Sequence, residues 1–332
     1  MYSEKKKLHE RERNHRAGEL RTIALDVTGK CNMRCKFCYA ETFTDKTPVS
    51  LDVLKKALDE AYEMGVCHYI LQGGEVCADY DRLKAIIEMI YPDETYINIV
   101  SNGWLMTRDK IEELRDLQVD RITFSLDSGI EQEHDASRMM GGYKRVLEAI
   151  DNVKAAGMLS GISTVVTHQS LHSEGFKEAY KIAEEKGIKF DVQIAEPVGK
   201  LDGERECLIT KEDAEFIYDM YINSPISSNG QRMVKRDLFR GDEVKCPAGK
   251  EFMAITVDGN VMPCNFIQAS LGNIKDRSLR EMRNELLKSR WFNQDYAYCL
   301  VGESKEYFDE IVYPNKDKVK PLDAYEIFEL YD

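Results

Sequence analysis

Short apolar runs alternate with longer amphipathic stretches along the chain from Thr22 onward. The stretches between the runs carry apolar residues at helical spacing, and glycines at Gly65, Gly157 and Gly187 stand where helices are expected to end. This alternation predicts βαβ units, and therefore an α/β fold with a parallel sheet that forms an incomplete or complete barrel. The six predicted strands are TIALDV (22–27), YILQ (69–72), YINIVS (96–101), RITFSL (121–126), GISTVV (161–166) and FDVQI (190–194).

The pattern changes after about Pro197. A loop, a helix over 211–223 and a polar connector are expected next, followed by two short strands around Asp258-Gly259, a dipeptide typical of hairpins. The last residues predict a docking helix or arm. Four segments follow from this: a charged N-terminal extension (1–21), a barrel domain (22–200), a bridging segment (201–245) and a small C-terminal domain with its tail (246–332).

Composition limits the classes of function. Of 332 residues, 43% are hydrophobic and 9% aromatic, which is enough for a folded core. The formal net charge of −13 argues against nucleic acid as the main partner. No run of eighteen apolar residues predicts a membrane span, and the N-terminus has no apolar segment typical of a secretory signal. Nine cysteines without such a signal favour a reducing compartment, so we expect a cytoplasmic protein.

Three cysteines, Cys31, Cys35 and Cys38 (the first trio), directly follow the first predicted strand. They therefore lie on a loop at a carboxyl strand end, where barrels keep their active sites. A zinc site and buried structural thiols are the alternatives, but structural zinc takes four ligands, and no second cysteine pair lies nearby. On a [4Fe-4S] cluster, three thiolates leave one iron without a protein ligand, which is the arrangement of a reactive centre.

The segment C-N-M-R-C-K-F-C-Y resembles the cluster motif of the radical S-adenosylmethionine (SAM) enzymes. Motifs at the next three strand ends also match: Gly-Gly-Glu after the second, Ser-Asn-Gly after the third and Ser-Leu-Asp-Ser after the fourth, with an arginine further on. The resemblance covers roughly residues 22–200. It implies a partial (β/α)6 TIM-like barrel whose first trio holds the cluster. The SAM contacts that it implies are Phe37, Tyr39, Gly73, Gly74, Glu75, Ser101, Asn102, Ser125, Asp127 and Arg138.

Each of these matches has an ordinary interpretation when taken alone. A glycine pair after a strand is a common turn, Ser125 and Asp127 would cap a helix, and Arg138 would be a surface residue. Their order at successive strand ends favours the joint interpretation. A glutamate suits the SAM ammonium and an arginine suits its carboxylate. Val76 departs from the family, which often has proline there.

A second set, Cys246, Cys264 and Cys299 (the second trio), flanks and follows the predicted hairpin. The surrounding pattern resembles the SPASM extension or its shorter form, Twitch, which carry auxiliary iron–sulfur clusters. The C-x2-C-x5-C-x3-C run of a full SPASM domain is absent, so we expect one auxiliary cluster. Its fourth ligand is left open between Cys207, an oxygen ligand and an open iron. The alternative is that these cysteines are small buried hydrophobes.

The resemblance implies an enzyme that cleaves SAM reductively to a 5′-deoxyadenosyl radical and abstracts hydrogen from a substrate carbon. An external donor such as a flavodoxin or ferredoxin would supply the electron. The auxiliary cluster suits oxidation or peptide crosslinking, whereas epimerisation needs a hydrogen donor, for which Cys77 or Cys207 would serve.

The resemblance favours a peptide substrate, with a small polar metabolite such as an aminosugar or aminocyclitol as the alternative. Only about twenty residues precede the first strand, which leaves no room for a leader-binding module and weakens the peptide hypothesis. The chain ends FELYD and lacks the glycine-rich tail of the GTP-cyclising relative, which argues against a role in molybdenum-cofactor synthesis. Two other classes remain: a non-catalytic iron–sulfur electron carrier or sensor, and a zinc-binding scaffold. Substrate identity, net reaction and oligomeric state do not follow from the sequence.

Overall fold

The computed structural model describes residues 4–229, 233–234 and 244–330. Within them, one nine-stranded sheet has the order β11-β10-β1-β2-β3-β4-β5-β6-β7. Neighbouring strands are parallel except for the β10–β11 pair. The strands are β1 (Thr22–Thr28), β2 (His68–Gly73), β3 (Tyr96–Ser101), β4 (Arg121–Ser125), β5 (Leu159–Val166), β6 (Lys189–Ile194), β7 (Ser227–Asn229), β10 (Phe252–Ile255) and β11 (Val261–Met262).

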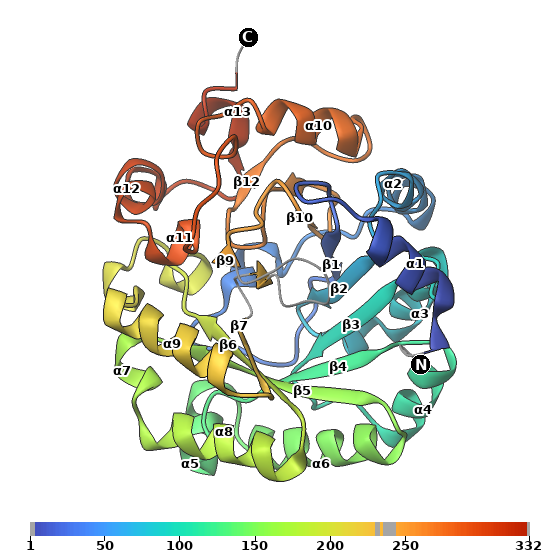
Figure 1. The fold of residues 1–332 in the computed structure, drawn as a ribbon, viewed down its shortest axis with the longest axis vertical. Helices are drawn as coiled ribbons and strands as arrows, with labels where there is room; N and C mark the ends of the chain where they lie inside the picture. Colours follow the sequence, from blue (N-terminus) through green and yellow to red (C-terminus); the bar gives the residue numbers. More distant parts are fainter. Residues whose placement is uncertain (1–3, 230–232, 235–243, 331–332) are drawn as a thin grey trace.

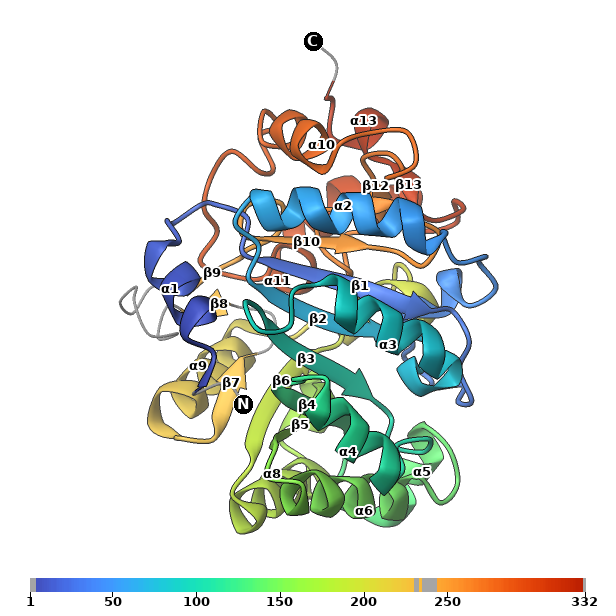
Figure 2. The ribbon, with the colours of Figure 1, turned by 90° about the vertical axis from the view of Figure 1, so that its right-hand side faces the viewer.

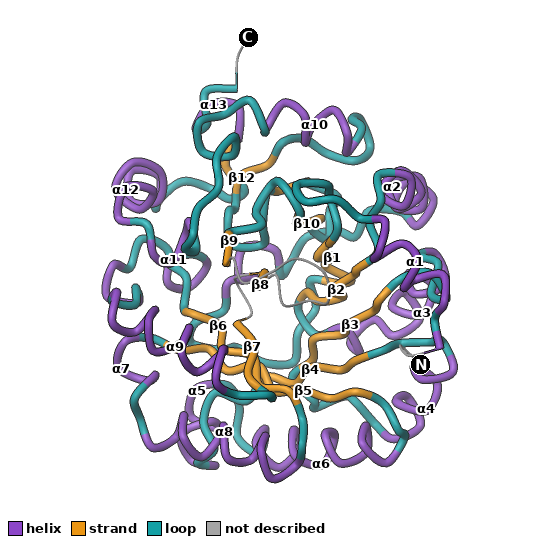
Figure 3. The backbone as a smooth tube through the Cα atoms, viewed as in Figure 1, coloured by secondary structure: helices purple, strands orange, loops and turns teal. Residues whose placement is uncertain are grey.

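The sheet is curved, with helices on its outer side (Figure 1; Figure 3). The α/β fold is confirmed, and all six predicted strands are present as β1 to β6. The sheet is an open barrel, because the described strands end at β11 on one side and β7 on the other. Two-stranded pairs add β8 (Met233–Val234) with β9 (Val244–Lys245) and β12 (Ala269–Ser270) with β13 (Leu322–Asp323).

Most helices follow the strands in sequence, and Figure 2 shows α2, α3 and α4 side by side over the outer face of the sheet. Helix α2 illustrates the local rules: the Ser50 side chain accepts a hydrogen bond from Val53 N at its start, and Leu54 and Leu58 are buried on one face. The helices are α1 (Lys6–Asn14), α2 (Leu51–Glu63), α3 (Tyr80–Met89), α4 (Arg108–Asp116), α5 (Glu131–Ser137), α6 (Gly142–Ala155), α7 (His168–Leu171), α8 (Glu174–Lys186), α9 (Lys211–Asn223), α10 (Leu279–Leu286), α11 (Leu300–Glu303), α12 (Lys305–Tyr307) and α13 (Ala324–Ile327).

The C-terminal hairpin differs from expectation in its placement. Its turn at Gly259 has φ +90°, which suits glycine, and the hairpin forms as predicted. It does not stand apart, however, because β10 joins the main sheet beside β1, pairing Thr22 with Phe252 and Leu25 with Ile255. The four segment boundaries predicted from the sequence stay predictions. Parts of the bridging segment, residues 230–232 and 235–243, lie outside the described residues.

The C-terminal helices also pack on the barrel. The Glu60 carboxylate at the end of α2 accepts hydrogen bonds from Leu279 N (2.9 Å) and Arg280 N (3.2 Å) at the start of α10. An acidic side chain at this position satisfies N–H groups that the helix itself leaves unpaired. The tail contributes β13 and the short α13. Among the described helices, none has the length and apolarity that crossing a bilayer would require.

The two faces of the sheet differ in polarity. Side chains such as Ile23, Tyr69, Ile97 and Phe124 face the outer helices and belong to the main hydrophobic core. The alternate positions turn inward and are largely polar, as the period of two along a strand requires. These inward residues include Asp26, Gln72, Asn98, Arg121, Thr123, Ser125, Ser163, Asp191 and Gln193.

An ion pair crosses this inner face. The Arg121 Nη2 of β4 lies 2.5 Å from Asp191 Oδ2 of β6, and both side chains are mostly buried. The guanidinium passes over Gly161 of β5, where a Cβ would lie 2.2 Å from Arg121 Nη2. Glycine at this position therefore leaves room for the pair. A buried arginine needs such a partner, since an unpaired buried charge is costly.

A testable consequence concerns Asp26, which is 6% exposed and accepts a hydrogen bond from Gln72 Nε2 at 3.3 Å. Burial raises the pKa of Asp26 to about 7. A raised pKa means that the folded state holds this proton more tightly than the unfolded state, so stability is full at low pH and falls as pH rises toward 7. The variant Asp26→Asn removes this loss. Its free energy of unfolding should exceed that of the unmodified chain at pH 8 by up to a few kcal/mol, since one pKa unit is about 1.4 kcal/mol.

The measurement is urea unfolding at pH 5.5 and pH 8, with Asp45→Asn, a change at an exposed aspartate, as the control. The two proteins should differ more in free energy of unfolding at pH 8 than at pH 5.5. An equal difference at both pH values would contradict the raised pKa of Asp26.

Candidate functional site

The first trio lies on the loop between β1 and the 3-10 turn η2 (Tyr39–Phe43). Its three thiols line one cavity of about 1130 Å³. Burial raises the pKa of the Cys31 thiol, and it raises the pKa of the Cys38 thiol to about 11. The thiolate is the form that binds metal, so a cationic group at this site would favour loading.

Arg138 supplies positive charge beside these thiols. Its Nη1 lies 3.7 Å from Cys35 Sγ, and its guanidinium carbon lies 5.2 Å from the centre of the Phe37 ring. Its Nε and Nη2 bond both oxygens of Asp127, the second at 3.0 Å. Burial disfavours the charge on Arg138, but Asp127 overrides that effect, and the pKa of Arg138 is raised. The structure thus brings Arg138, Asp127 and the first trio together.

The Gly73-Gly74-Glu75 turn packs directly on the first trio's loop. Gly74 N donates to Thr28 O and Glu75 N donates to Lys30 O, both at 2.8 Å. A Cβ on Gly74 would lie 2.2 Å from Lys30 O, and Gly73 has φ +136°. The two glycines are therefore required by backbone contact with the cysteine loop.

The Glu75 side chain points away from solvent and is 1% exposed. Its carboxylate accepts hydrogen bonds from Ser101 Oγ (2.9 Å), Asn102 N (2.8 Å) and Cys77 N (3.2 Å), while burial raises its pKa. These bonds join the end of β2 to the end of β3. Contact between Glu75 and a SAM ammonium stays a prediction, since Gly73 and Gly74 line the cavity and the described lining does not include Glu75.

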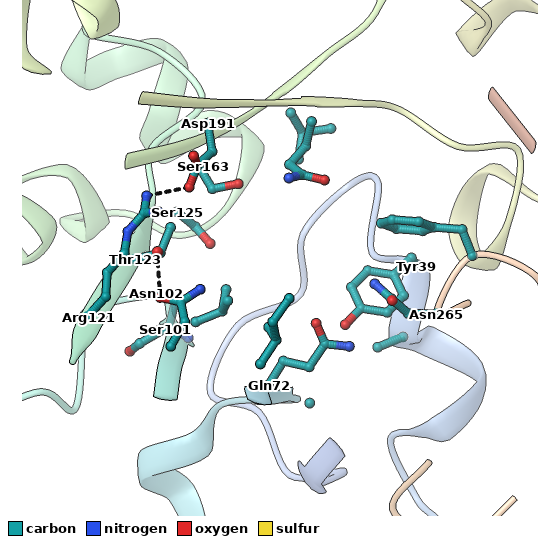
Figure 4. A pocket seen from close by; sticks show the side chains of 18 of the residues that line it. Tyr39, Gln72, Ser101, Asn102, Arg121, Thr123, Ser125, Ser163, Asp191 and Asn265 are labelled. Carbon is teal, nitrogen blue, oxygen red and sulfur yellow. Dashed lines mark hydrogen bonds and ion pairs between the residues drawn. The ribbon is translucent and has the colours of Figure 1, made fainter. Parts of the chain in front are cut away.

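Other predicted residues lie in the same cavity wall. Asn102 donates from Nδ2 to Asn32 Oδ1 at 2.9 Å and lies 4.0 Å from Cys31 Sγ. The residues of the SAM prediction that line the cavity are Phe37, Tyr39, Gly73, Gly74, Ser101, Asn102, Ser125 and Arg138. Figure 4 shows Ser101, Thr123, Ser125, Ser163 and Asp191 gathered on one side, with Tyr39, Gln72 and Asn265 on the other.

The second trio lines the same cavity as the first. Cys246 follows β9, Cys264 follows β11, and Cys299 is the N-cap residue of α11. Burial raises the pKa of all three thiols, to about 12 for Cys264, and the nearby charge of Glu196 adds to the rise in each. Sequence reasoning missed Glu196, whose only signal is its place just after the sixth strand.

The loops of the two trios contact each other. The rings of Tyr39 and Phe266 meet edge to face, with centres 5.2 Å apart. Gln268 Nε2 donates to Tyr39 O at 2.7 Å, and its Oε1 lies 3.4 Å from Thr42 Oγ1. The loop after Cys264 is thereby fixed on the residues that follow Cys38.

The two predicted hydrogen donors lie elsewhere. Cys77 is buried in the hydrophobic core, with Sγ 3.8 Å from Met106 Sδ, and burial raises its pKa to about 12. Cys207 is also buried, and its Sγ lies 3.0 Å from Glu204 O. Neither belongs to the described cavity lining, so a donor role for either stays a prediction that this placement does not favour.

Comparison with known proteins supplies the family context. The model of the Radical SAM superfamily matches residues 25–190, and the model of an iron-sulfur cluster-binding domain, SPASM, matches residues 246–301. An AdoMet-dependent heme synthase from Nitratidesulfovibrio vulgaris is 26% identical over 83% of this chain and 82% of its own length. A PqqA peptide cyclase from Methylocella silvestris is 24% identical over 78% of this chain and 73% of its own length. Streptococcus suis SuiB bound to precursor peptide SuiA has a TM-score of 0.63 at 16% identity, covering 84% of this chain and 67% of SuiB.

The residues present fit the cofactors of these families, which are SAM and [4Fe-4S] clusters. Each cysteine of such a cluster binds a different iron, so the thiols need to surround one space and need not converge on one ion. The thiols of both trios line the cavity, and within each trio they lie close enough to interact electrostatically. Among the residues that the structure describes, no three His, Cys, Asp or Glu side chains are placed to hold a single metal ion.

The turn that supports the first trio can be tested by Gly74→Ala. The added Cβ would meet Lys30 O at 2.2 Å, so the cysteine loop must move. We expect the variant to lose the iron of the first trio, about four atoms per chain, after anaerobic reconstitution. Iron and sulfide analysis together with EPR of the reduced protein gives the measurement.

Gly18→Ala is the matched control, because Gly18 also has positive φ (+83°) but a Cβ there meets nothing within 4 Å. It should lose some stability and no iron. Full iron content in Gly74→Ala would show that the close backbone contact is not needed for loading.

Proposed function

Since the chain belongs to the radical SAM superfamily and carries a SPASM domain, we propose that it is an enzyme that removes hydrogen from a carbon of a substrate held between the two cysteine trios. The observation that carries this proposal is that both trios line one cavity. A substrate in that cavity lies within reach of both sites. We propose oxidation as the net reaction, because a cluster held by the second trio would supply an acceptor for the electron that remains on the substrate.

The first trio would hold the cluster that binds SAM, which leaves one iron without a cysteine. When bound, this cluster and SAM supply an organic radical able to remove hydrogen from an unactivated carbon. Arg138 has one nitrogen, Nη1, that is not bonded to Asp127 and faces the cysteine side, which suits a carboxylate. Asp127 holds the guanidinium in this orientation.

The chain's own residues would position the substrate and exclude water. The inner face of the sheet offers amide and hydroxyl groups, including Gln72, Asn98 and Ser163, that can hydrogen-bond a polar substrate. The Arg121–Asp191 pair gives this wall a fixed charge pattern. A wall that keeps water from the substrate limits side reactions of reactive species.

A peptide segment is the substrate class that we propose. The cavity of about 1130 Å³ would hold SAM and both clusters together with the reacting part of a peptide. Relatives named as a PqqA peptide cyclase and as the subtilosin biosynthesis protein AlbA match most of this chain. Crosslinking or epimerisation of a peptide would use the same site, and a flavodoxin or ferredoxin would supply the electron.

A second candidate is oxidation of a non-peptide metabolite. Three relatives named AdoMet-dependent heme synthase match 79–83% of this chain at 26–27% identity. The hydrogen-bonding groups on the cavity wall would also suit a metabolite that carries several polar groups. Comparing binding of short peptides and of polar metabolites to the reconstituted protein, by calorimetry, distinguishes the two classes.

The first test of the proposal is SAM cleavage. The anaerobically reconstituted protein, given SAM and dithionite, should form 5′-deoxyadenosine, and Cys35→Ala should reduce this product to background because the first site loses a ligand. Cys67→Ala, a change at a buried core cysteine outside both trios, should retain the activity. No product from a chain with a fully loaded first site would overturn the enzymatic proposal in favour of an electron carrier.

The second test separates the two sites. Cys264→Ala should lose the iron of the second trio but still cleave SAM, while substrate oxidation stops because the electron acceptor is missing. Iron analysis and 5′-deoxyadenosine formation are measured on the same sample, and product mass is measured once a substrate class is found. Normal substrate turnover by Cys264→Ala would show that the second trio has no part in the reaction.

A further inference from the structure

Glu196 lies beside the second trio, just after the end of β6. Its side chain lines the cavity that the three thiols line, and the residue is only 5% exposed. Its Oε1 lies 3.3 Å from Cys299 Sγ. Buried charges in proteins are paired or bind metals, and a carboxylate oxygen is an accepted ligand for iron.

The backbone around Glu196 fixes its position. Ala195 N donates to Val166 O at 2.7 Å, and Val198 N donates to Glu196 O at 2.8 Å. These bonds join the loop to the end of β5 and turn it back on itself. The carboxylate is therefore presented from the rigid end of the sheet.

A glycine on α11 makes room for the carboxylate. A Cβ on Gly302 would lie 2.5 Å from Ile194 Cδ1, 2.7 Å from Glu196 Oε2 and 2.9 Å from Glu196 Oε1, closer than a Cβ approaches other atoms, so the glycine leaves room for both side chains. Gly302 is buried, one helical turn after Cys299. The same helix therefore presents one thiol of the second trio and the recess that receives the carboxylate.

We propose that Glu196 is the fourth protein ligand of the cluster held by the second trio. This inference rests on the proposed auxiliary cluster. Of the three alternatives that the sequence leaves open for the fourth ligand, the inference selects the oxygen ligand. A carboxylate oxygen of Glu196 would bind the iron that the three cysteines do not hold. The competing thiol, Cys207, lies outside the described cavity lining, with its Sγ against Glu204 O.

The test uses the full chain with the first trio changed to alanine, so that any cluster belongs to the second trio. After reconstitution with iron and sulfide, this parent should bind about four irons per chain. Mild oxidation with ferricyanide strips the iron that lacks a protein ligand and leaves a three-iron cluster, which EPR detects. We expect Glu196→Gln, which keeps the size of the side chain, to raise the three-iron signal several-fold over the parent.

Two further variants sharpen the test. Cys207→Ala should oxidise like the parent, whereas Gly302→Ala keeps Glu196 but fills its recess and should behave like Glu196→Gln. Circular dichroism checks that each variant is folded. Equal three-iron signals in Glu196→Gln and the parent would overturn the inference, and so would a raised signal in Cys207→Ala alone.

The iron content of the parent separates this inference from the function that it rests on. A parent that binds no iron overturns the auxiliary cluster and, with it, the role of Glu196. A parent that binds about four irons but is insensitive to Glu196→Gln overturns the ligand assignment and leaves the auxiliary cluster in place.

Discussion

The parallel pairing of β10 with β1 is the constraint on which the site depends. It aligns Thr22 with Phe252 and Leu25 with Ile255, although these residues are separated by most of the chain. Ladder hydrogen bonds fix register, because a slip of one residue would turn every side chain to the other face. The loop after β1 carries the first trio, and the chain after β10 carries Cys264. One sheet therefore places the first trio and Cys264 around one cavity, without relying on the docking of two independent bodies.

The site also depends on glycines at points where another group of the chain lies too close for a side chain. Gly74 packs on the carbonyl of Lys30, Gly161 lets Arg121 cross to β6, and Gly302 receives the carboxylate of Glu196. In each case a side chain would occupy the space of a functional group. Glycine costs conformational entropy, so its use at these points reflects the need for close approach.

The local parts of this arrangement could be predicted from the sequence. The six strands, the α9 helix and the hairpin at Gly259 follow from periodicity and turn residues, and cysteine spacing indicates the first trio. The joining of β10 to β1 could not be predicted, because no local signal specifies pairing across such a sequence distance. The same limit explains Cys77. Its place two residues after Glu75 suggests the barrel mouth, yet the turn that begins at Val76 directs it into the core.

Glu196 belongs to the part that the sequence alone hides, since one acidic residue after a strand resembles any helix cap or solvated turn. The significance of its position becomes clear only from the contacts of the loop that it begins. Three residues later, Gly199 packs on the carbonyl of Cys38 with φ +62°, and Lys200 N donates to that carbonyl at 3.1 Å. One short loop after β6 thus contacts Cys299 at its start and Cys38 at its end. Because the loop is anchored to the end of β5, a shift at either trio must strain its contact with the other. The geometry of the two sites is therefore set jointly, which the proposed transfer of an electron from a substrate to the second site would require.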